Sequence, residues 1–127
     1  MINNPVRIGL IGLGTVGTGV AKLLLEDSEA IYQRTGIRLE LARIVDKDIV
    51  SKRKINIPSG LLTSDINQII DDPSILIAIE LVGGTTFAKQ VQEKLLQVDM
   101  PFVCPVLFLV FQHLFRRIHS CRTIFCA

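Results

Sequence analysis

The chain has 127 residues, a length that suits one domain with a hydrophobic core and leaves little room for a second. A formal net charge of +2 with 20% charged residues provides no strongly basic or acidic surface, so neither nucleic acid nor a membrane is expected as a partner. The first residues contain no basic segment followed by a hydrophobic stretch, so we expect no secretory signal and a cytoplasmic location.

The first predicted element is a buried strand over residues 6–11, and a helix is predicted over residues 15–32. Val16, Val20 and Leu24 recur at helical spacing and are expected to face the core. Between the strand and the helix stands the motif Gly12-x-Gly14-x-x-Gly17. There the first glycine permits a tight turn, the second lets a diphosphate approach the backbone, and the third lets the helix pack closely on the sheet.

This context predicts dinucleotide binding, with a tight strand-to-helix turn alone as the alternative. The helix start would offer unpaired N–H groups and the positive end of its dipole to the diphosphate. The residues expected to hold the cofactor here are Gly12, Leu13, Gly14, Thr15, Val16 and Gly17.

A second strand is predicted over residues 37–46, and a surface loop follows over residues 47–60. Asp46, at the end of that strand, is expected to accept hydrogen bonds from the adenosine ribose, unless it is only a solvated strand end. Cations in the loop would instead suit the 2′-phosphate of NADP, unless they too are only solvated. These cations are Lys47, Lys52 and Arg53. NAD and NADP therefore both stay open as the cofactor.

The pattern continues with a short helix over residues 64–70, a strand over residues 75–82 and a helix over residues 85–97. Gly83, Gly84 and Thr85 follow the third strand and are expected to close over the nicotinamide half of the cofactor. A simple turn is the alternative. Glu80 is expected near the wet end of its strand. The order β-α-β-α-β-α predicts an α/β fold, a Rossmann-like doubly wound parallel sheet that is incomplete.

The composition changes after about residue 97. Most of the Phe, all three Cys and both His lie beyond this point, and no acidic residue follows Asp99. The apolar run over residues 102–111 is far shorter than the roughly 20 residues of a membrane-spanning helix and contains Pro105. The Cys have no C-x-x-C spacing, so free thiols are expected and no metal site, although a weak Cys/His cluster is conceivable.

Three segments resemble the N-terminal nucleotide-binding domain of homoserine dehydrogenase: IGLIGLGTVGTGV (residues 8–20), VDKDIVSKR (45–53) and IAIELVGGTTFA (77–88). The resemblance implies reduction of aspartate semialdehyde to homoserine with NADPH or NADH, on the route to threonine, methionine and isoleucine. It also implies a homodimer for the full-length enzyme. Residues 12–17 would hold the diphosphate, Asp46 with Lys47 or Arg53 the adenosine ribose, and residues 83–85 the nicotinamide ribose.

The resemblance ends near residue 97. The family continues with a Gly-Lys-His-Val-Val-like strand, an active-site lysine and a substrate and dimerisation domain, none of which is recognisable here. Codons for residues 97–102 can be chosen such that reading them one base out of frame gives Gly-Arg-His-Ala-Val. This peptide is close to the strand expected in the family. We therefore predict a cofactor-binding domain over residues 1–97 and an atypical, non-native or frameshifted tail over residues 98–127, with no catalytic residue. The alternatives are a stand-alone nucleotide-binding or redox-sensing module and a membrane-associated or interaction fragment.

Overall fold

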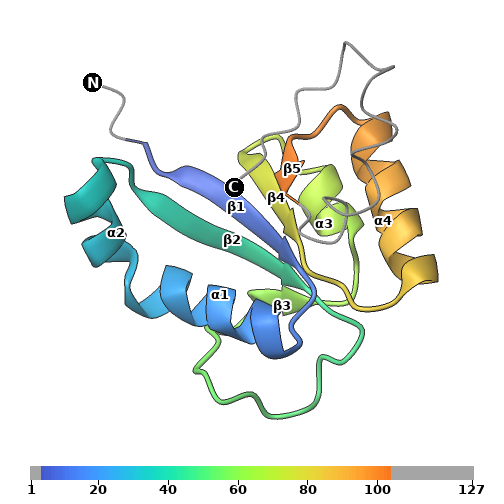
Figure 1. Cartoon of the computed structure of the whole chain (residues 1–127), viewed down its shortest axis with the longest axis horizontal. Helices are drawn as coiled ribbons and strands as arrows, with labels where there is room; N and C mark the ends of the chain where they lie inside the picture. Colours follow the sequence, from blue (N-terminus) through green and yellow to red (C-terminus); the bar gives the residue numbers. More distant parts are fainter. Residues whose placement is uncertain (1–3, 104–127) are drawn as a thin grey trace.

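Five parallel strands form one sheet in the order β3-β2-β1-β4-β5 (Figure 1). The computed structural model describes residues 4–103. The strands are β1 (Val6–Ile11), β2 (Leu39–Val45), β3 (Leu62–Thr63), β4 (Ile75–Glu80) and β5 (Phe102–Val103). The chain runs from β1 outward to β2 and β3, then returns to the other side of β1 for β4 and β5. In sheets wound in this way, ligands bind where the winding reverses, beside the carboxyl ends of the strands.

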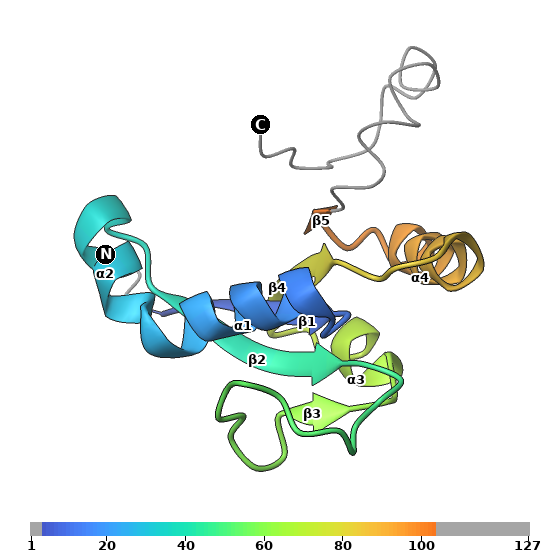
Figure 2. The same cartoon turned by 60° about the horizontal axis from the view of Figure 1, so that its bottom comes forward.

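Helices cover both faces of this sheet. Within the described residues they are α1 (Thr15–Glu26), α2 (Ser28–Thr35), α3 (Asn67–Ile70) and α4 (Thr85–Gln97). One hydrophobic core joins α1 to the sheet through Leu24 and Leu10, and a second joins α3 and α4 to it through Ile69 and Val91. In Figure 2, α1 and α2 lie together, apart from α3 and α4. This arrangement confirms the predicted doubly wound α/β fold.

The single helix predicted over residues 15–32 is two helices in the structure. They meet at Asp27, whose φ of −110° and ψ of 14° interrupt the helical geometry. Asp27 and Ser28 are residue types whose side chains hydrogen-bond locally and compete with a continuous helix, so the pair favours a break at this point.

Of the three residues predicted to face the core from α1, Leu24 is buried and Val20 packs partly buried against the core, but Val16 is not buried. Gly17, Ala21 and Leu24 are buried, whereas Val16 is 64% exposed. The close approach of the helix to the sheet at Gly17 sets this orientation, because it turns the glycine toward the loop after β1 and turns Val16 toward solvent.

The sequence does not predict β3 or β5. Each strand has two residues, too few for an alternating pattern to be recognised. In β5, Phe102 pairs with Ala78 of β4 and is only 2% exposed. Residues 102–103 therefore extend the sheet beyond residue 97, where the predicted cofactor-binding domain ends. Residues 104–127, with the three Cys and both His, lie outside the described part of the chain, and their character stays a prediction.

Candidate functional site

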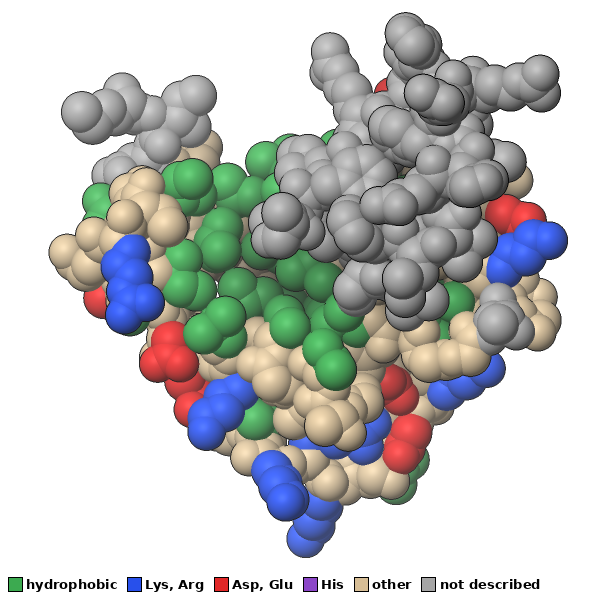
Figure 3. All heavy atoms as spheres, in the orientation of Figure 1, with side chains coloured by type: hydrophobic (Ala, Val, Ile, Leu, Met, Phe, Trp, Pro, Cys, Tyr) green, Lys and Arg blue, Asp and Glu red, His purple; other side chains and the backbone are tan. Residues whose placement is uncertain are grey.

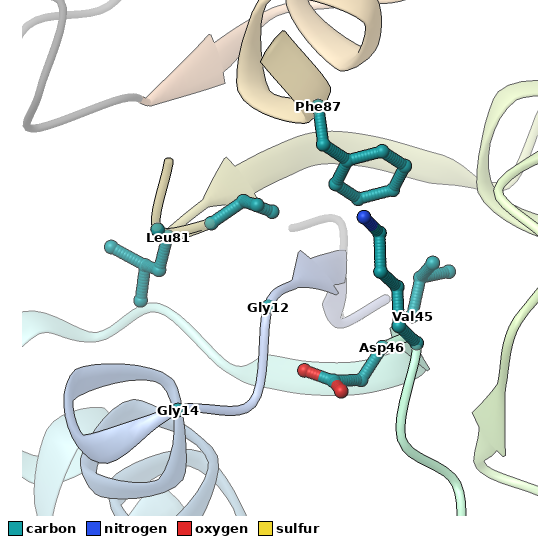
Figure 4. A pocket seen from close by; sticks show the side chains of 9 residues that line it. Gly12, Gly14, Val45, Asp46, Leu81 and Phe87 are labelled. Carbon is teal, nitrogen blue, oxygen red and sulfur yellow. The ribbon is translucent and has the colours of Figure 1, made fainter. Parts of the chain in front are cut away.

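The carboxyl ends of β1, β2 and β4 border a cavity of about 230 Å³ at the switch point (Figure 4). One wall is the glycine loop after β1, another is the end of β2, and the third is the loop after β4 with the start of α4. The lining residues are Gly12, Gly14, Val45, Asp46, Lys47, Leu81, Val82, Gly83 and Phe87. The structure thus brings together the glycine loop, Asp46 and Gly83, as the sequence predicts.

Two glycines of the loop are required by the fold itself. Gly12 has a φ of +99°, and a Cβ atom there would lie 2.8 Å from the backbone carbon of Leu81. A Cβ atom on Gly17 would lie 2.0 Å from the carbonyl oxygen of Gly12. The Gly12 N–H donates to the carbonyl oxygen of Val45 at 2.8 Å and anchors the loop to β2. A side chain at Gly12 would push the loop away from the backbone that follows β4, and one at Gly17 would push α1 away from the loop.

Gly14 is different, because no protein atom would lie within 4 Å of a Cβ atom added there. Gly14 is the N-cap of α1, and Thr15 and Val16 begin the first turn of that helix. The N–H groups of a first helical turn have no partner within the helix, and they carry the positive end of its dipole. The open space at Gly14 therefore lies beside donors suited to an anionic group.

Asp46 connects the end of β2 to the glycine loop. Its Oδ2 atom accepts a hydrogen bond of 2.6 Å from the Leu13 N–H, and its Oδ1 atom accepts one of 2.8 Å from the Asp48 N–H. The Asp46 side chain is 18% exposed. Both carboxylate oxygens thus hold backbone in place, a task that the sequence pattern does not reveal.

Arg53 lines a second, larger cavity of about 610 Å³ on the outer side of the glycine loop. Its guanidinium donates to the carbonyl oxygens of Asp48 and Ser51 at 2.8 and 3.1 Å, and it lies 3.5 Å from Asp46 Oδ1. Lys52 and Lys54 line the same cavity. In Figure 3, basic side chains gather at the lower end of the molecule, over the loop between β2 and β3.

Asp48 organises this basic loop. The Ser51 hydroxyl and the Ser51 and Val50 N–H groups bond to the Asp48 carboxylate and hold its pKa well below the usual range. The two N–H groups lie 2.9 and 3.1 Å from Asp48 Oδ1. The resulting turn presents Lys52, Arg53 and Lys54 next to Asp46.

Lys47 lies apart from those cations. It lines the cavity at the switch point and not the larger one, and its Nζ atom lies 4.2 Å from the centroid of the Phe87 ring. The sequence predicts Lys47 beside Arg53 at the adenosine ribose and gives no prediction for Phe87. An aromatic residue in the first turn of a helix that begins at the switch point is the signal that would have singled it out.

The loop after β4 is fixed by Glu80, whose predicted position at the solvent-exposed end of the strand is wrong. Glu80 is fully buried instead of lying at a wet strand end. Its Oε1 atom accepts a hydrogen bond of 2.7 Å from the Val82 N–H, and its Oε2 atom accepts one of 3.0 Å from Gln92 of α4. A lone carboxylate in an apolar strand was the available signal, because buried charges in proteins are normally paired.

The segment after this loop carries the last predicted site residues. Gly83 lines the cavity, Gly84 is the N-cap of α4 with a φ of +92°, and Thr85 begins the helix. Glycine suits this N-cap position, since a φ in this range favours a residue without a Cβ atom.

Within residues 4–103, no cluster of three or more His, Cys, Asp or Glu side chains is arranged to hold a metal ion. No helix in that part of the chain has both the length and the apolar character of a membrane span.

Comparison with known proteins identifies the family. Residues 12–118 match the family model described as the NAD binding domain of homoserine dehydrogenase. The chain belongs to the homoserine dehydrogenase family. The match includes residues 98–118, which belong to the predicted tail. The dinucleotide cofactor predicted from the glycine motif is thereby confirmed as NAD(P), without a choice between NAD and NADP.

Individual relatives agree with this assignment. The chain is 35% identical to homoserine dehydrogenase of Bacillus subtilis over 85 residues, covering 67% of this chain and 20% of the relative. It is 35% identical to that of Helicobacter pylori over 98 residues, covering 77% of this chain and 23% of the relative. The crystal structure of S. aureus homoserine dehydrogenase at pH 7.5 superposes with a TM-score of 0.70 and 31% identity, over 80% of this chain and 26% of that one. The chain thus spans about a fifth to a quarter of the length of these proteins.

Proposed function

We propose that this chain is the cofactor-binding part of an enzyme that reduces aspartate semialdehyde to homoserine, on the route to threonine, methionine and isoleucine. The observation that supports the proposal most directly is the open space at Gly14, beside the first turn of α1 and within a glycine loop that Asp46 holds in place. The fold itself leaves room for a side chain there, and a ligand that occupies this space gives a reason for glycine.

In this proposal the backbone of residues 12–17 binds the diphosphate. Asp46 and Arg53 border the adenosine ribose, and residues 83–85 border the nicotinamide ribose. NADH or NADPH supplies a hydride when bound, and the chain's own residues bind and orient it at the switch point. The rigid path from β4 into α4, held by Glu80, keeps Gly83 at the cavity wall. Lys52 and Lys54 in the larger cavity are the cations that would favour a 2′-phosphate.

The chain alone is proposed to be inactive. Hydride transfer to an aldehyde needs the substrate held against the nicotinamide and a proton donor at its oxygen. The active-site lysine that the family resemblance implies has no counterpart in the sequence. The proposal includes homodimer formation by the whole enzyme, no nucleic-acid or membrane partner, and the cytoplasmic location that the sequence predicts. It also keeps residues 104–127 as a non-native or frameshifted tail.

Calorimetric titration of the purified 127-residue chain with NADH and with NADPH tests this function. We expect saturable binding of at least one cofactor and no oxidation of either in the presence of aspartate semialdehyde. Adenosine serves as the control ligand, because it lacks the diphosphate. A folded chain that binds neither cofactor would contradict the proposal, and turnover of the semialdehyde would contradict the inactivity of the isolated chain.

A further inference from the structure

Lys47 and Phe87 both line the cavity at the switch point, into which the Phe87 side chain points (Figure 4). Lys47 follows the end of β2, and Phe87 lies in the first turn of α4. The Lys47 Nζ atom lies 4.2 Å from the centroid of the Phe87 ring, within the range of a cation–π interaction. The contact therefore bridges two walls of the cavity that also contains Gly12 and Gly14.

Within the described part of the chain, no carboxylate forms an ion pair with Lys47. The other charged side chain that lines this cavity is Asp46, and its two oxygens already accept from the N–H groups of Leu13 and Asp48. An aromatic ring holds a cation by its quadrupole without neutralising it. The cavity thus keeps one ammonium group with its charge available.

A diphosphate is the part of a dinucleotide that needs such a charge. The glycine loop offers backbone N–H groups but no formal charge, and Asp46 already uses the N–H of Leu13. The ammonium of lysine has three N–H donors, so it can rest against a ring and still donate to a phosphate oxygen. A charge-assisted hydrogen bond of this kind is stronger than one from a neutral donor.

We propose that Phe87 is a positioning residue that holds the Lys47 ammonium in the cavity, where Lys47 donates to the diphosphate of the bound dinucleotide. This inference rests on the proposed function, since it concerns the same cavity. It gives Lys47 a different task from Arg53, which lines the larger cavity on the outer side of the glycine loop. The two basic residues thus serve different parts of one ligand.

The test compares variants of the 127-residue chain by the dissociation constant for NADH or NADPH, whichever binds more tightly. Lys47→Met removes the charge and should weaken binding about tenfold or more. Phe87→Leu keeps an apolar side chain without a ring face and should weaken binding roughly three- to tenfold. Phe87→Tyr keeps the ring face and should bind like the unaltered chain. Lys89→Met is the matched control, because Lys89 is 77% exposed on the same helix and should not affect binding.

The double variant separates positioning from a general effect on packing. If Phe87 acts through Lys47, Phe87→Leu should have little effect in the Lys47→Met background. Lys47→Met should also reduce the dependence of the affinity on salt concentration, which loss of a merely structural contact would not do. With AMP and ADP as probes, the loss caused by Lys47→Met should be larger for ADP, because only ADP has the diphosphate.

Four results would overturn the inference: an unchanged affinity in Lys47→Met, independent effects of the two substitutions, a weakened Phe87→Tyr variant, or tighter binding by Phe87→Leu. The last result would mean that the ring withholds Lys47 from the ligand. If the unaltered chain binds neither NADH nor NADPH, the proposed function itself fails. If it binds one of them and the Lys47 and Phe87 variants bind equally well, only this inference fails.

Discussion

The carboxylate of Asp46 and the backbone N–H of Leu13 form a hydrogen bond of 2.6 Å, which joins the end of β2 to the loop after β1. The same carboxylate accepts from the Asp48 N–H, so it also fixes the start of the basic loop. Asp46, the residue expected to recognise the adenosine ribose, therefore also holds the glycine loop and the start of the basic loop in place. Its substitution should change geometry and charge together, and the two effects need separate variants.

We expect Asp46→Asn and Asp46→Ala to differ. Asparagine keeps an acceptor for one of the two N–H groups but loses the negative charge, so the ratio of NADPH to NADH affinity should rise. Alanine loses the acceptor as well and should lower the free energy of unfolding by about 1–3 kcal/mol. Calorimetry and denaturant unfolding measure the two quantities. An unchanged affinity ratio in both variants would show that Asp46 has only its structural role.

Gly14→Asp should separate binding from folding. Aspartate is a favourable N-cap residue, and no protein atom would lie within 4 Å of its Cβ atom, so the melting temperature should stay the same or rise slightly. The added carboxylate would occupy and repel the position of the diphosphate, and NAD(P)H binding should be abolished. Gly14→Ala, which adds only a methyl group, should weaken binding to a smaller extent. Unchanged affinity in folded Gly14→Asp would place the ligand elsewhere.

Gly17 and Gly19 form a matched pair within α1. Gly17→Ala would bring a Cβ atom to 2.0 Å from the Gly12 carbonyl oxygen, so the helix must move off the loop at a cost of about 1–3 kcal/mol. Gly19→Ala meets no atom within 4 Å and should stabilise the helix by about 0.5–1 kcal/mol. Thermal and denaturant unfolding report both changes. Equal effects would mean that α1 and the glycine loop do not pack as closely as described.

Much of the fold follows from local patterns in the sequence. Long apolar strands and the glycine motif are local signals, and they predict β1, β2, β4 and the position of the site. The roles of Glu80 and Phe87 depend instead on tertiary contacts. The partner of Phe87 is distant in the sequence, and the turn into α4 brings the partner of Glu80 close. Glu80 contacts Gln92, and Phe87 contacts Lys47 from the other side of the switch point. Such partners become apparent only when the sheet is assembled.

The hydrogen bonds to Asp48 should make stability depend on pH. Because the folded-state pKa of Asp48 is lowered by Ser51 and Val50, its carboxylate stabilises the fold above the unfolded pKa of about 3.9, and this contribution is lost as the pH falls below that value. Asp48→Asn should therefore reduce the melting temperature at neutral pH and flatten its decline between about pH 4 and pH 2. Melting temperatures measured for both proteins across this pH range test the prediction. If the two melting temperatures fall in parallel as the pH is lowered, Asp48 does not have this role.

The end of the packed domain can be located by two truncations. Ending the chain after Gln97 removes β5 and Phe102, which is 2% exposed and packs in the core with Val91 and Leu95. Loss of one buried aromatic side chain should lower the free energy of unfolding by about 1.5–3 kcal/mol.

Ending the chain after Val103 keeps β5 and removes only the residues still predicted to be a non-native tail. That truncation should leave the melting temperature unchanged and improve solubility, because it removes an apolar segment without acidic residues. Phe102→Ala in the full chain is the control, since it should reproduce most of the loss caused by ending the chain after Gln97. A sharp fall in melting temperature on truncation after Val103 would show that residues beyond β5 belong to the native core.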